Sequence, residues 1–391
     1  GSELRAFNNV GWHRDTRGEV RDLIGLTGFG PNINIARDPR FGRSSELPGE
    51  DPTLSGVYAT EMVQGMQEED AHGYPKMLAF LKHFTAYSTE TNRGHDDYTI
   101  SQHDLFETYL PQYEMAFTKG GASGAMCSYN AVNGHPSCAN SFVLNTLVKQ
   151  TWSPHAIITT DCGAVHNLLG PPANAPSNEA AAAWALNNGT DIEMGSTEFT
   201  DHLVNATKLG LTTEAAVTAA ARRTQRALFR LGRFDPPGAS EWHAFGEEIL
   251  NSSAHQAAVW DAALQGLVLL KNDGGALPLA AGGAVAVLGP QAVGRRSLLS
   301  DYYGDDVCWT GSCSGHECYD CIPTIAEAVA SYNTGGTTTS AAGVDINSNA
   351  TSGIAAALAL GRDADTIVLA LGIDKTVETE GTDRADTALP G

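Results

Sequence analysis

Acidic side chains stand directly after two apolar, strand-like stretches of the chain. Asp161 follows the stretch IITT at residues 157–160, and Glu378 and Glu380 follow the stretch DTIVLALG near the end of the chain. Two carboxylates at one glycosidic bond can hydrolyse it with retention, because one attacks the anomeric carbon while the other protonates the leaving oxygen. An Asp after a strand is also common in an ordinary turn, where its side chain accepts hydrogen bonds from backbone amides.

A carboxylate that acts as nucleophile must stay ionised, so cationic and hydroxylic side chains are expected beside it. Candidates of these kinds near other strand-like stretches are Arg43, Lys82, His83 and Tyr129. Lys82 and His83 are neighbours on a predicted strand, so both reach one site only if the backbone bends there. The alternative for this pair is a lysine that reaches solvent beside a buried core histidine.

The partner carboxylate must instead be held protonated, in a less polar or a more anionic setting. Glu378 and Glu380 lie two residues apart. Repulsion between them would favour the protonated form of one.

Alternating strand-like and helix-like stretches must position these side chains. The strand-like pieces of residues 1–235 are GPNINIARDP, MLAFLKHFTAY, GASGAMCSYNAVNG, HAIITTDCGA and NNGTDIEMG. Helical stretches lie between them, one of which is predicted to begin with a cap at Ser101 or Asp104. This alternation predicts a (β/α)8-type barrel with parallel strands, whose functional side chains follow the carboxyl ends of the strands.

A second α/β domain is predicted after the barrel. The last barrel helix stops at DPPG, a linker covers residues 236–249, and residues 250–391 form a sandwich with the apolar strands GAVAVLGP and DTIVLALG. The stretches NTGGTTTSAAG and SCSGHECYDC are interpreted as surface loops. We expect the barrel to lack its first strands and the second domain its last part, so that another chain or segment completes the barrel.

The bulk composition excludes several classes of partner. The chain has 391 residues and a net charge of −21, which disfavours nucleic acid and anionic membrane surfaces as partners. Glycine-rich nucleotide-binding motifs and a Gly-x-Ser-x-Gly nucleophile are absent from the sequence. A neutral substrate, or one handled by carboxylates, fits better, and no metal or cofactor is expected.

Cysteines and glycosylation sequons point to a secreted, extracellular protein. The sequence has seven cysteines, and sequons begin at Asn188, Asn205, Asn251 and Asn349. Disulfides are the favoured interpretation of the cysteine-rich stretch from Cys308 to Cys321, with zinc as the alternative.

Taken jointly and in order, several motifs resemble glycoside hydrolase family 3, in its fungal and plant β-xylosidase branch. They are RAFNN, PNINIARDPRFGRSSELPGEDP, FLKHFTAY, MCSYNAVNGHPSCAN, TTDCGAV, RLGRFDPP, GLVLLKNDGGALPL, VAVLGP and ETEGTDR. The resemblance implies a barrel followed by an α/β sandwich domain, with the active site between them. It also implies a retaining exo-hydrolase that releases β-D-xylose from non-reducing ends of xylo-oligosaccharides and xylan, without a cofactor.

Residue roles follow from the same resemblance. It implies that Asp161 is the nucleophile. For the acid/base, counting from Gly372 favours Glu378 and counting back from the DR of ETEGTDR favours Glu380, and we choose Glu378. The predicted substrate-binding residues are Arg43, Glu46, Lys82, His83, Met126, Tyr129 and Glu380.

The stretch around the nucleophile also resembles the xylosidase branch, since glucosidase-like members carry Trp where this chain has Cys162. A Cys162–Cys127 or a Cys162–Cys138 bridge is expected, and Met194 stands where the branch often has Cys. The stretch STETNRG at residues 88–94 departs from the branch. The alternative functions are a β-glucosidase, an arabinofuranosidase, or an inactive sugar-binding fragment.

Overall fold

The structure is a computed structural model that describes residues 1–11, 24–299, 302–303, 308 and 318–390. It divides into two compact units. The first unit comprises residues 1–38 and 47–257, and the second comprises residues 39–46 and 258–391.

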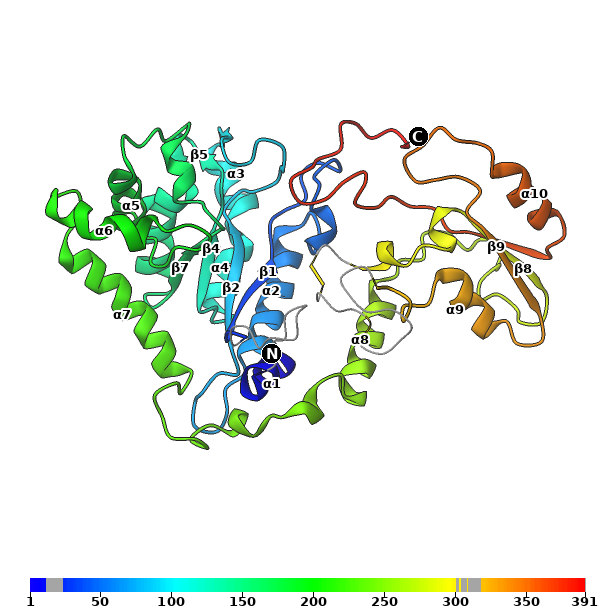
Figure 1. Cartoon of the computed structure of the whole chain (residues 1–391), viewed down its shortest axis with the longest axis horizontal. Helices are drawn as coiled ribbons and strands as arrows, with labels where there is room; N and C mark the ends of the chain where they lie inside the picture. Colours follow the sequence, from blue (N-terminus) through cyan, green and yellow to red (C-terminus); the bar gives the residue numbers. More distant parts are fainter. Residues whose placement is uncertain (12–23, 300–301, 304–307, 309–317, 391) are drawn as a thin grey trace. The chain divides into compact units, whose positions relative to one another are not determined.

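The centre of the first unit is a parallel sheet in the order β1-β2-β4-β7 (Figure 1). Its strands are β1 (Thr27–Asn32), β2 (Leu78–Phe84), β4 (Gly124–Cys127) and β7 (Ile157–Thr160). β2, β4 and β7 lie within predicted strand-like pieces, whereas β1 overlaps the piece GPNINIARDP, which begins at Gly30, only in its last three residues. The prediction of parallel strands alternating with helices is confirmed. The piece NNGTDIEMG forms only a single parallel bridge, from Ile192 to Thr159.

Helices separate these strands. α2 (Pro52–Gln67) begins after Asp51, whose side chain accepts a hydrogen bond from the Leu54 N–H, and Ser101 caps α3 (Gln102–Asp104) in the same way. The others of the first unit are α1 (Ser2–Val10), η2 (Leu105–Tyr109), α4 (Pro111–Thr118), η4 (Phe142–Trp152), α5 (Asn178–Asn187), α6 (Glu198–Lys208) and α7 (Glu214–Arg230), and α8 (Ser253–Gly266) follows them. Figure 1 shows α2 and α4 beside β1, β2 and β4.

Short elements complete the first unit. A small sheet contains β3 (Asp97–Tyr98), β5 (Ala131–Val132) and β6 (His135–Pro136). Single turns of 3₁₀ helix occur at η3 (Ser137–Ala139), η5 (His166–Leu169), η6 (Glu241–Ala244) and η7 (Glu247–Ile249).

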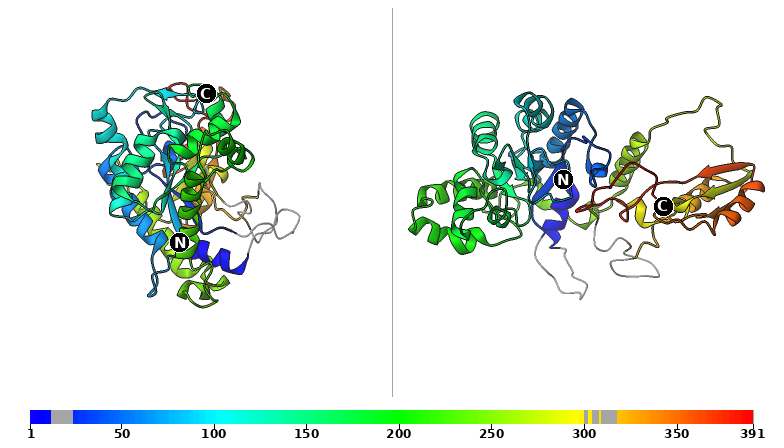
Figure 2. Two further views of the ribbon diagram at one scale, coloured as in Figure 1. Left: turned by 90° about the vertical axis from the view of Figure 1, so that its left-hand side faces the viewer. Right: turned by 90° about the horizontal axis from the view of Figure 1, so that it is seen from above.

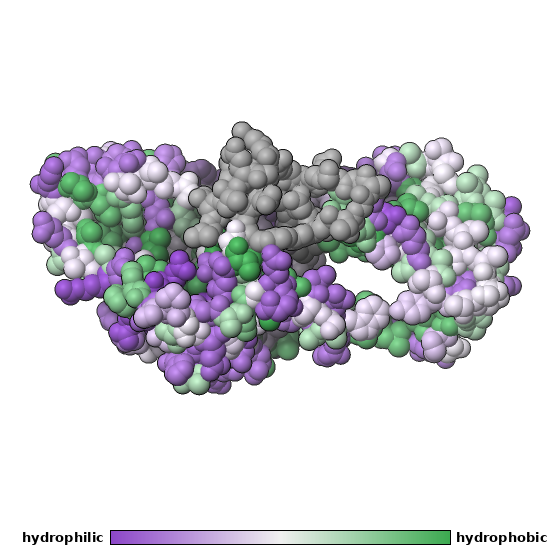
Figure 3. Space-filling model, turned by 60° about the horizontal axis from the view of Figure 1, so that its bottom comes forward, coloured by the Kyte–Doolittle hydropathy of each residue, from purple (hydrophilic) through white to green (hydrophobic). Residues whose placement is uncertain are grey.

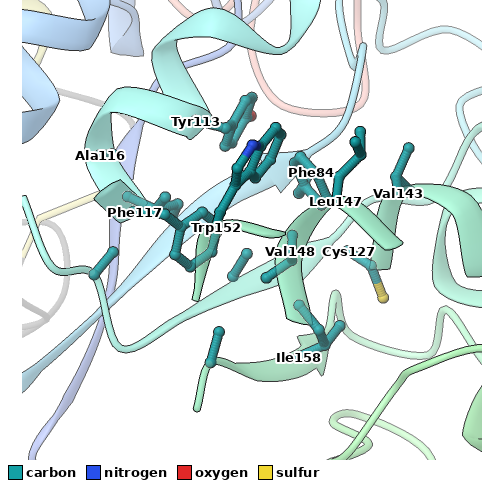
Figure 4. Close-up of a cluster of buried hydrophobic side chains, with 14 of the residues drawn as sticks. Phe84, Tyr113, Ala116, Phe117, Cys127, Val143, Leu147, Val148, Trp152 and Ile158 are labelled. Carbon is teal, nitrogen blue, oxygen red and sulfur yellow. The ribbon is translucent and has the colours of Figure 1, made fainter. Parts of the chain in front are cut away.

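Aromatic side chains fill the core between the sheet and its helices (Figure 4). The ring of Trp152 lies 6.3 Å from that of Phe84 and 6.2 Å from that of Phe117, and Tyr113 packs edge-on against Phe84 at 4.9 Å. Because Phe84 ends β2, this core fixes the strand end that carries two of the predicted site residues.

The second unit is a three-layer arrangement built on β8 (Ala284–Leu288). This strand pairs in parallel with β10 (Thr366–Leu369) and β9 (Thr337–Ala341). Alternate side chains of β8 enter two clusters, one packed with residues of α9 (Ile325–Tyr332) and the other with Ala357 of α10 (Ile354–Arg362). Figure 2 shows both helices beside these strands. Successive side chains of β8 therefore point to opposite faces of the sheet, and each face is covered by a helix.

The structure overturns one loop prediction. NTGGTTTSAAG contains β9, a strand of β-branched threonines whose flanking glycines concealed it. The other predicted loop, SCSGHECYDC, lies mostly outside the described residues. Further short turns of the second unit are η1 (Ser44–Glu46), η8 (Pro290–Ala292) and η9 (Arg296–Leu298).

The disulfides differ in part from the expected ones. Cys127 pairs with Cys138, so neither of the expected bridges to Cys162 is present, and Cys162 is an exposed thiol. Cys308 pairs with Cys321, which confirms disulfide chemistry for that stretch.

Hydrophilic residues are spread widely over the part of the face in Figure 3 that is not grey. Within the described ranges, no helix combines the length and apolar character needed to cross a membrane.

Candidate active site

Asp161 immediately follows β7, and both interpretations of it from the sequence find support in its contacts. Its Oδ1 accepts a hydrogen bond of 2.8 Å from the Cys162 N–H, as in an ordinary turn. Its Oδ2 lies 3.7 Å from Nε2 of His83, and its side chain is 13% exposed. Gly163, with φ of 77°, supplies the left-handed residue that the turn requires. One carboxylate oxygen is thus held by the turn, while the other lies near an imidazole.

His83 is buried at the end of β2 and is held by Asn34. The Oδ1 of Asn34 accepts a hydrogen bond from the His83 N–H at 2.8 Å and lies 3.2 Å from the ring Nδ1. The Nδ2 of Asn34 donates to the His83 carbonyl at 2.8 Å. Because the backbone and the ring share one partner, the imidazole has little freedom to turn away from Asp161.

The strand that carries Lys82 and His83 is irregular at this pair. The register between β2 and β4 shifts between Leu81 and Phe84, so the alternation of a regular strand is interrupted there. His83 is 2% exposed, whereas Lys82 is half-buried. The departure from regularity that the functional interpretation required is therefore present.

The end of β4 brings two more predicted residues to the same edge of the sheet. Met126 is buried and lies beside Thr159 of β7 in the register. The Tyr129 hydroxyl donates to the Cys162 carbonyl at 2.9 Å. Burial, together with the charge of Asp161, raises the pKa of Tyr129, so its hydroxyl remains a donor.

The remaining predicted residues belong to the second unit. Arg43 is 1% exposed and forms a bidentate pair with Glu46, at 2.6 Å from Nε to Oε1 and 2.9 Å from NH2 to Oε2. The NH1 of Arg43 also lies 3.8 Å from Oε1 of Glu380, whose Oε2 accepts a hydrogen bond of 2.5 Å from the Tyr302 hydroxyl. The guanidinium of Arg43 thus contacts two other predicted residues, Glu46 and Glu380.

The segment that carries both candidate acids is anchored to the loop before Arg43. The Gly42 N–H donates to Oδ1 of Asp383 at 2.8 Å, and the Arg384 N–H donates to the Arg40 carbonyl at 2.9 Å. Glu378 lies earlier in this segment, where its N–H donates to the Asp374 carbonyl at 3.3 Å.

Family models match nearly the whole length of the chain. The N terminal domain of glycosyl hydrolase family 3 matches residues 2–227, and the C-terminal domain of the same family matches residues 267–391. The chain belongs to glycosyl hydrolase family 3.

Relatives within family 3 include proteins named as xylosidases. A probable exo-1,4-beta-xylosidase of Aspergillus clavatus is 36% identical over 398 residues, which cover 100% of this chain and 48% of the relative. The exo-1,4-beta-xylosidase of Aspergillus niger is 36% identical over 403 residues, which cover 99% of this chain and 47% of the relative. The chain spans about half the length of the curated relatives it matches.

Solved glycosidase structures superpose on the chain. An exo-beta-xylosidase bound to a xylobiose aziridine probe has a TM-score of 0.85 and 34% identity, covering 100% of this chain and 48% of that one. A beta-glucosidase of saponin metabolism from intestinal bacteria has a TM-score of 0.82 and 26% identity, covering 98% of this chain and 53% of that one. These likenesses confirm the predicted fold class.

Sequence reasoning missed several residues of this family 3 chain that contact predicted site residues. Tyr302 binds Glu380, Tyr87 packs against His83, and Arg93 packs against Tyr129. Glu90, in the same loop after β2, binds both Tyr87 and Arg93. For Glu90 and Arg93 the available signal was the unusual stretch STETNRG, in which the two residues stand three positions apart. Tyr87 and Tyr302 lie outside this stretch. Within the described part of the chain, no cluster of three or more His, Cys, Asp or Glu side chains could hold a metal ion.

Proposed function

We propose that this chain carries the catalytic residues of a retaining exo-glycosidase that removes β-D-xylose from the non-reducing ends of xylo-oligosaccharides and xylan. The observation that carries this proposal is the 36% identity, over the whole chain, to relatives named exo-1,4-beta-xylosidases. The position of Asp161 after β7, beside His83, supports it as well.

In the proposed reaction, Asp161 attacks the anomeric carbon and Glu378 protonates the leaving oxygen, after which Glu378 activates water to release the sugar. Retaining chemistry requires the two carboxyl groups to be about 5–5.5 Å apart when the substrate is bound. Lys82, His83 and Tyr129 would hold the sugar hydroxyls, and Met126 would line the apolar side of the subsite.

The charges around Glu380 argue against Glu380 as the acid/base. Glu380 lies near the Arg43 guanidinium and accepts a hydrogen bond from Tyr302. Both contacts stabilise a carboxylate in its ionised form. A general acid has to hold its proton until the leaving oxygen takes it. We therefore assign Glu380, with Arg43 and Glu46, to substrate binding.

Hydrolysis of p-nitrophenyl β-D-xyloside, compared with the matching glucoside, tests the proposal. We expect faster turnover of the xyloside and loss of at least ~10⁴-fold in kcat for Asp161→Asn, because the covalent step is removed. The matched control is Asp201→Asn, which changes an exposed carboxylate on α6. Addition of azide to Asp161→Gly should yield α-xylosyl azide, since azide takes the place of the nucleophile. Full activity of Asp161→Asn would show that the nucleophile assignment is wrong.

A β-glucosidase is the second candidate, favoured by the similarity to the intestinal bacterial beta-glucosidase. A larger kcat/KM for the glucoside would select it. Binding of xylobiose without turnover of either glycoside would instead identify a sugar-binding fragment.

We further propose that the protein is secreted. The support is the presence of disulfides, which include Cys127–Cys138 and Cys308–Cys321, together with the four sequons.

A further inference from the structure

A single buried carboxylate organises the loop after β2. The Glu90 side chain is fully buried, and its Oε2 lies 2.8 Å from NH1 of Arg93. Its Oε1 accepts a hydrogen bond of 2.6 Å from the Tyr87 hydroxyl. The Arg93 NH1 also donates to that hydroxyl at 3.0 Å. Burying a charge is costly unless it is paired and hydrogen-bonded, and here both carboxylate oxygens have partners.

The two side chains held by Glu90 pack against two candidate site residues. The Tyr87 ring lies 4.9 Å from the imidazole of His83. The Arg93 guanidinium lies 4.8 Å from the centre of the Tyr129 ring. His83 and Tyr129 in turn reach Asp161 from β2 and from the end of β4, the first at the carboxylate and the second through the carbonyl of Cys162.

From this arrangement we propose that Glu90 and Arg93 are positioning residues for the Asp161 nucleophile, which fix His83 through Tyr87 and Tyr129 through the Arg93 guanidinium. This inference rests on the proposed function. It assigns a role to a loop whose sequence departs from the branch that the chain resembles.

Geometry and charge each contribute to this role. A planar guanidinium covers an aromatic face while it donates sideways to a carboxylate, which the ammonium group of a lysine does less well. The pair also places opposite charges beside Tyr129, whose pKa both Arg93 and Asp161 affect. The Arg93 cation would favour the ionised form of Asp161, and the Glu90 carboxylate would offset that effect. Titratable groups placed around Asp161 include His83 from β2, with Lys82 next to it on the same strand, Tyr129 after β4 and the Cys162 thiol in its own turn.

Four variants separate the two contributions: Arg93→Lys, Arg93→Gln, Glu90→Gln and the double variant Glu90→Gln/Arg93→Gln. A misplacement of a catalytic group by about 1 Å can cost ~100-fold in rate. We therefore expect Arg93→Lys to lower kcat on the xyloside by ~10- to 100-fold, with a smaller change in KM and an unchanged pH midpoint of the acid limb of kcat/KM. Arg222→Gln, on the exposed surface of α7, is the matched control.

The charge contribution predicts shifts of opposite sign. Loss of the cation in Arg93→Gln should move the pH midpoint of the acid limb of kcat/KM to higher pH by ~0.5 unit. Loss of the anion in Glu90→Gln should move the same midpoint to lower pH by ~0.5 unit. In the double variant, the pH midpoint of the acid limb of kcat/KM should lie close to that of the unchanged protein. A loop with a merely structural role would lose activity without these opposed shifts.

Alkylation of the Cys162 thiol by iodoacetamide gives a readout that needs no catalytic activity. The pH midpoint of the reaction, followed by mass spectrometry of the Cys162 peptide, should move in the same two directions, because a nearby cation favours the thiolate. Midpoints that do not move, or that move the same way in Arg93→Gln and Glu90→Gln, would overturn the inference. Activity that survives Asp161→Asn would overturn the proposed function instead. Should Arg93→Gln fail to fold, the kcat of Arg93→Lys and the pH shift of Glu90→Gln still test the inference.

Discussion

At the scale of single residues, Asp161 shows why sequence alone left two interpretations open. Its Oδ1 accepts a hydrogen bond from the backbone N–H of Cys162, as the side chain of an aspartate in a turn does, while its Oδ2 lies near His83. Both features arise from one residue after a buried strand. The sequence could therefore predict the position of this carboxylate, but not the partners of each oxygen, because His83 comes from a different strand.

The two glutamates of the second unit permit a prediction at this scale. We expect Glu378→Gln to slow hydrolysis of a xyloside with a poor leaving group far more than that of the 2,4-dinitrophenyl xyloside, which needs no protonation of its leaving oxygen. Glu380→Gln should raise KM for both substrates alike, because it alters the group bound to Arg43 and Tyr302. Steady-state kinetics on both substrates make the test, and the reverse pattern would exchange the two roles.

At the scale of elements, a buried aspartate fixes the strand that presents the nucleophile. Asp191 has a fully buried side chain that lies 2.8 Å from Nζ of Lys149 in η4 and 2.7 Å from Nε of Arg223 in α7. It also accepts a hydrogen bond of 2.9 Å from the Ile158 N–H of β7. The position of Asp161 thus depends on a contact made three residues earlier.

Removal of this carboxylate should destabilise the protein strongly. Asp191→Ala leaves Lys149 and Arg223 without their shared anion, and breaking a buried pair costs about 3–5 kcal/mol in the free energy of unfolding. Urea denaturation measures this quantity, with Glu61→Ala, an exposed carboxylate on α2, as control. A loss of stability no larger than that of the control would show that the cluster adds little.

The elements themselves were predicted from sequence where the local signal was strong. Apolar runs such as IITT and the capping residue Ser101 marked their elements correctly. β9 was missed because a Thr-rich segment between glycines has the composition of a loop, and its pairing with β8 lies far away in the sequence. The Cys127–Cys138 bridge was missed for the same reason, since spacing does not determine which thiols meet.

At the scale of the whole molecule, the net charge of −21 is a property that the sequence states directly. The sequence also predicted the order of two α/β parts. It did not predict that residues 39–46 belong with the second unit. That membership depends on hydrogen bonds of Arg40 and Gly42 to residues about 340 positions later, and no local pattern encodes such partners.

The excess of negative charge predicts how stability responds to salt. Like charges repel within the compact state, and added ions screen this repulsion. We expect the Tm at pH 7 to rise as NaCl increases from about 10 mM to about 500 mM, with the steepest rise at the low end, where the screening length changes most. Differential scanning calorimetry gives the Tm, and KCl at equal ionic strength is the control. A Tm that falls with salt would contradict the expectation.

The glycine at position 42 determines how tightly the loop of Arg43 and the segment after β10 can approach each other. A Cβ atom there would lie 2.1 Å from the Thr382 carbonyl oxygen and 2.5 Å from that of Thr379. Even one methyl group would force apart the backbones that bring Arg43 to Glu380, while leaving every side chain around Asp161 chemically intact. A chain with alanine at position 42 would thus keep the proposed nucleophile Asp161 but lose the contact between Arg43 and Glu380.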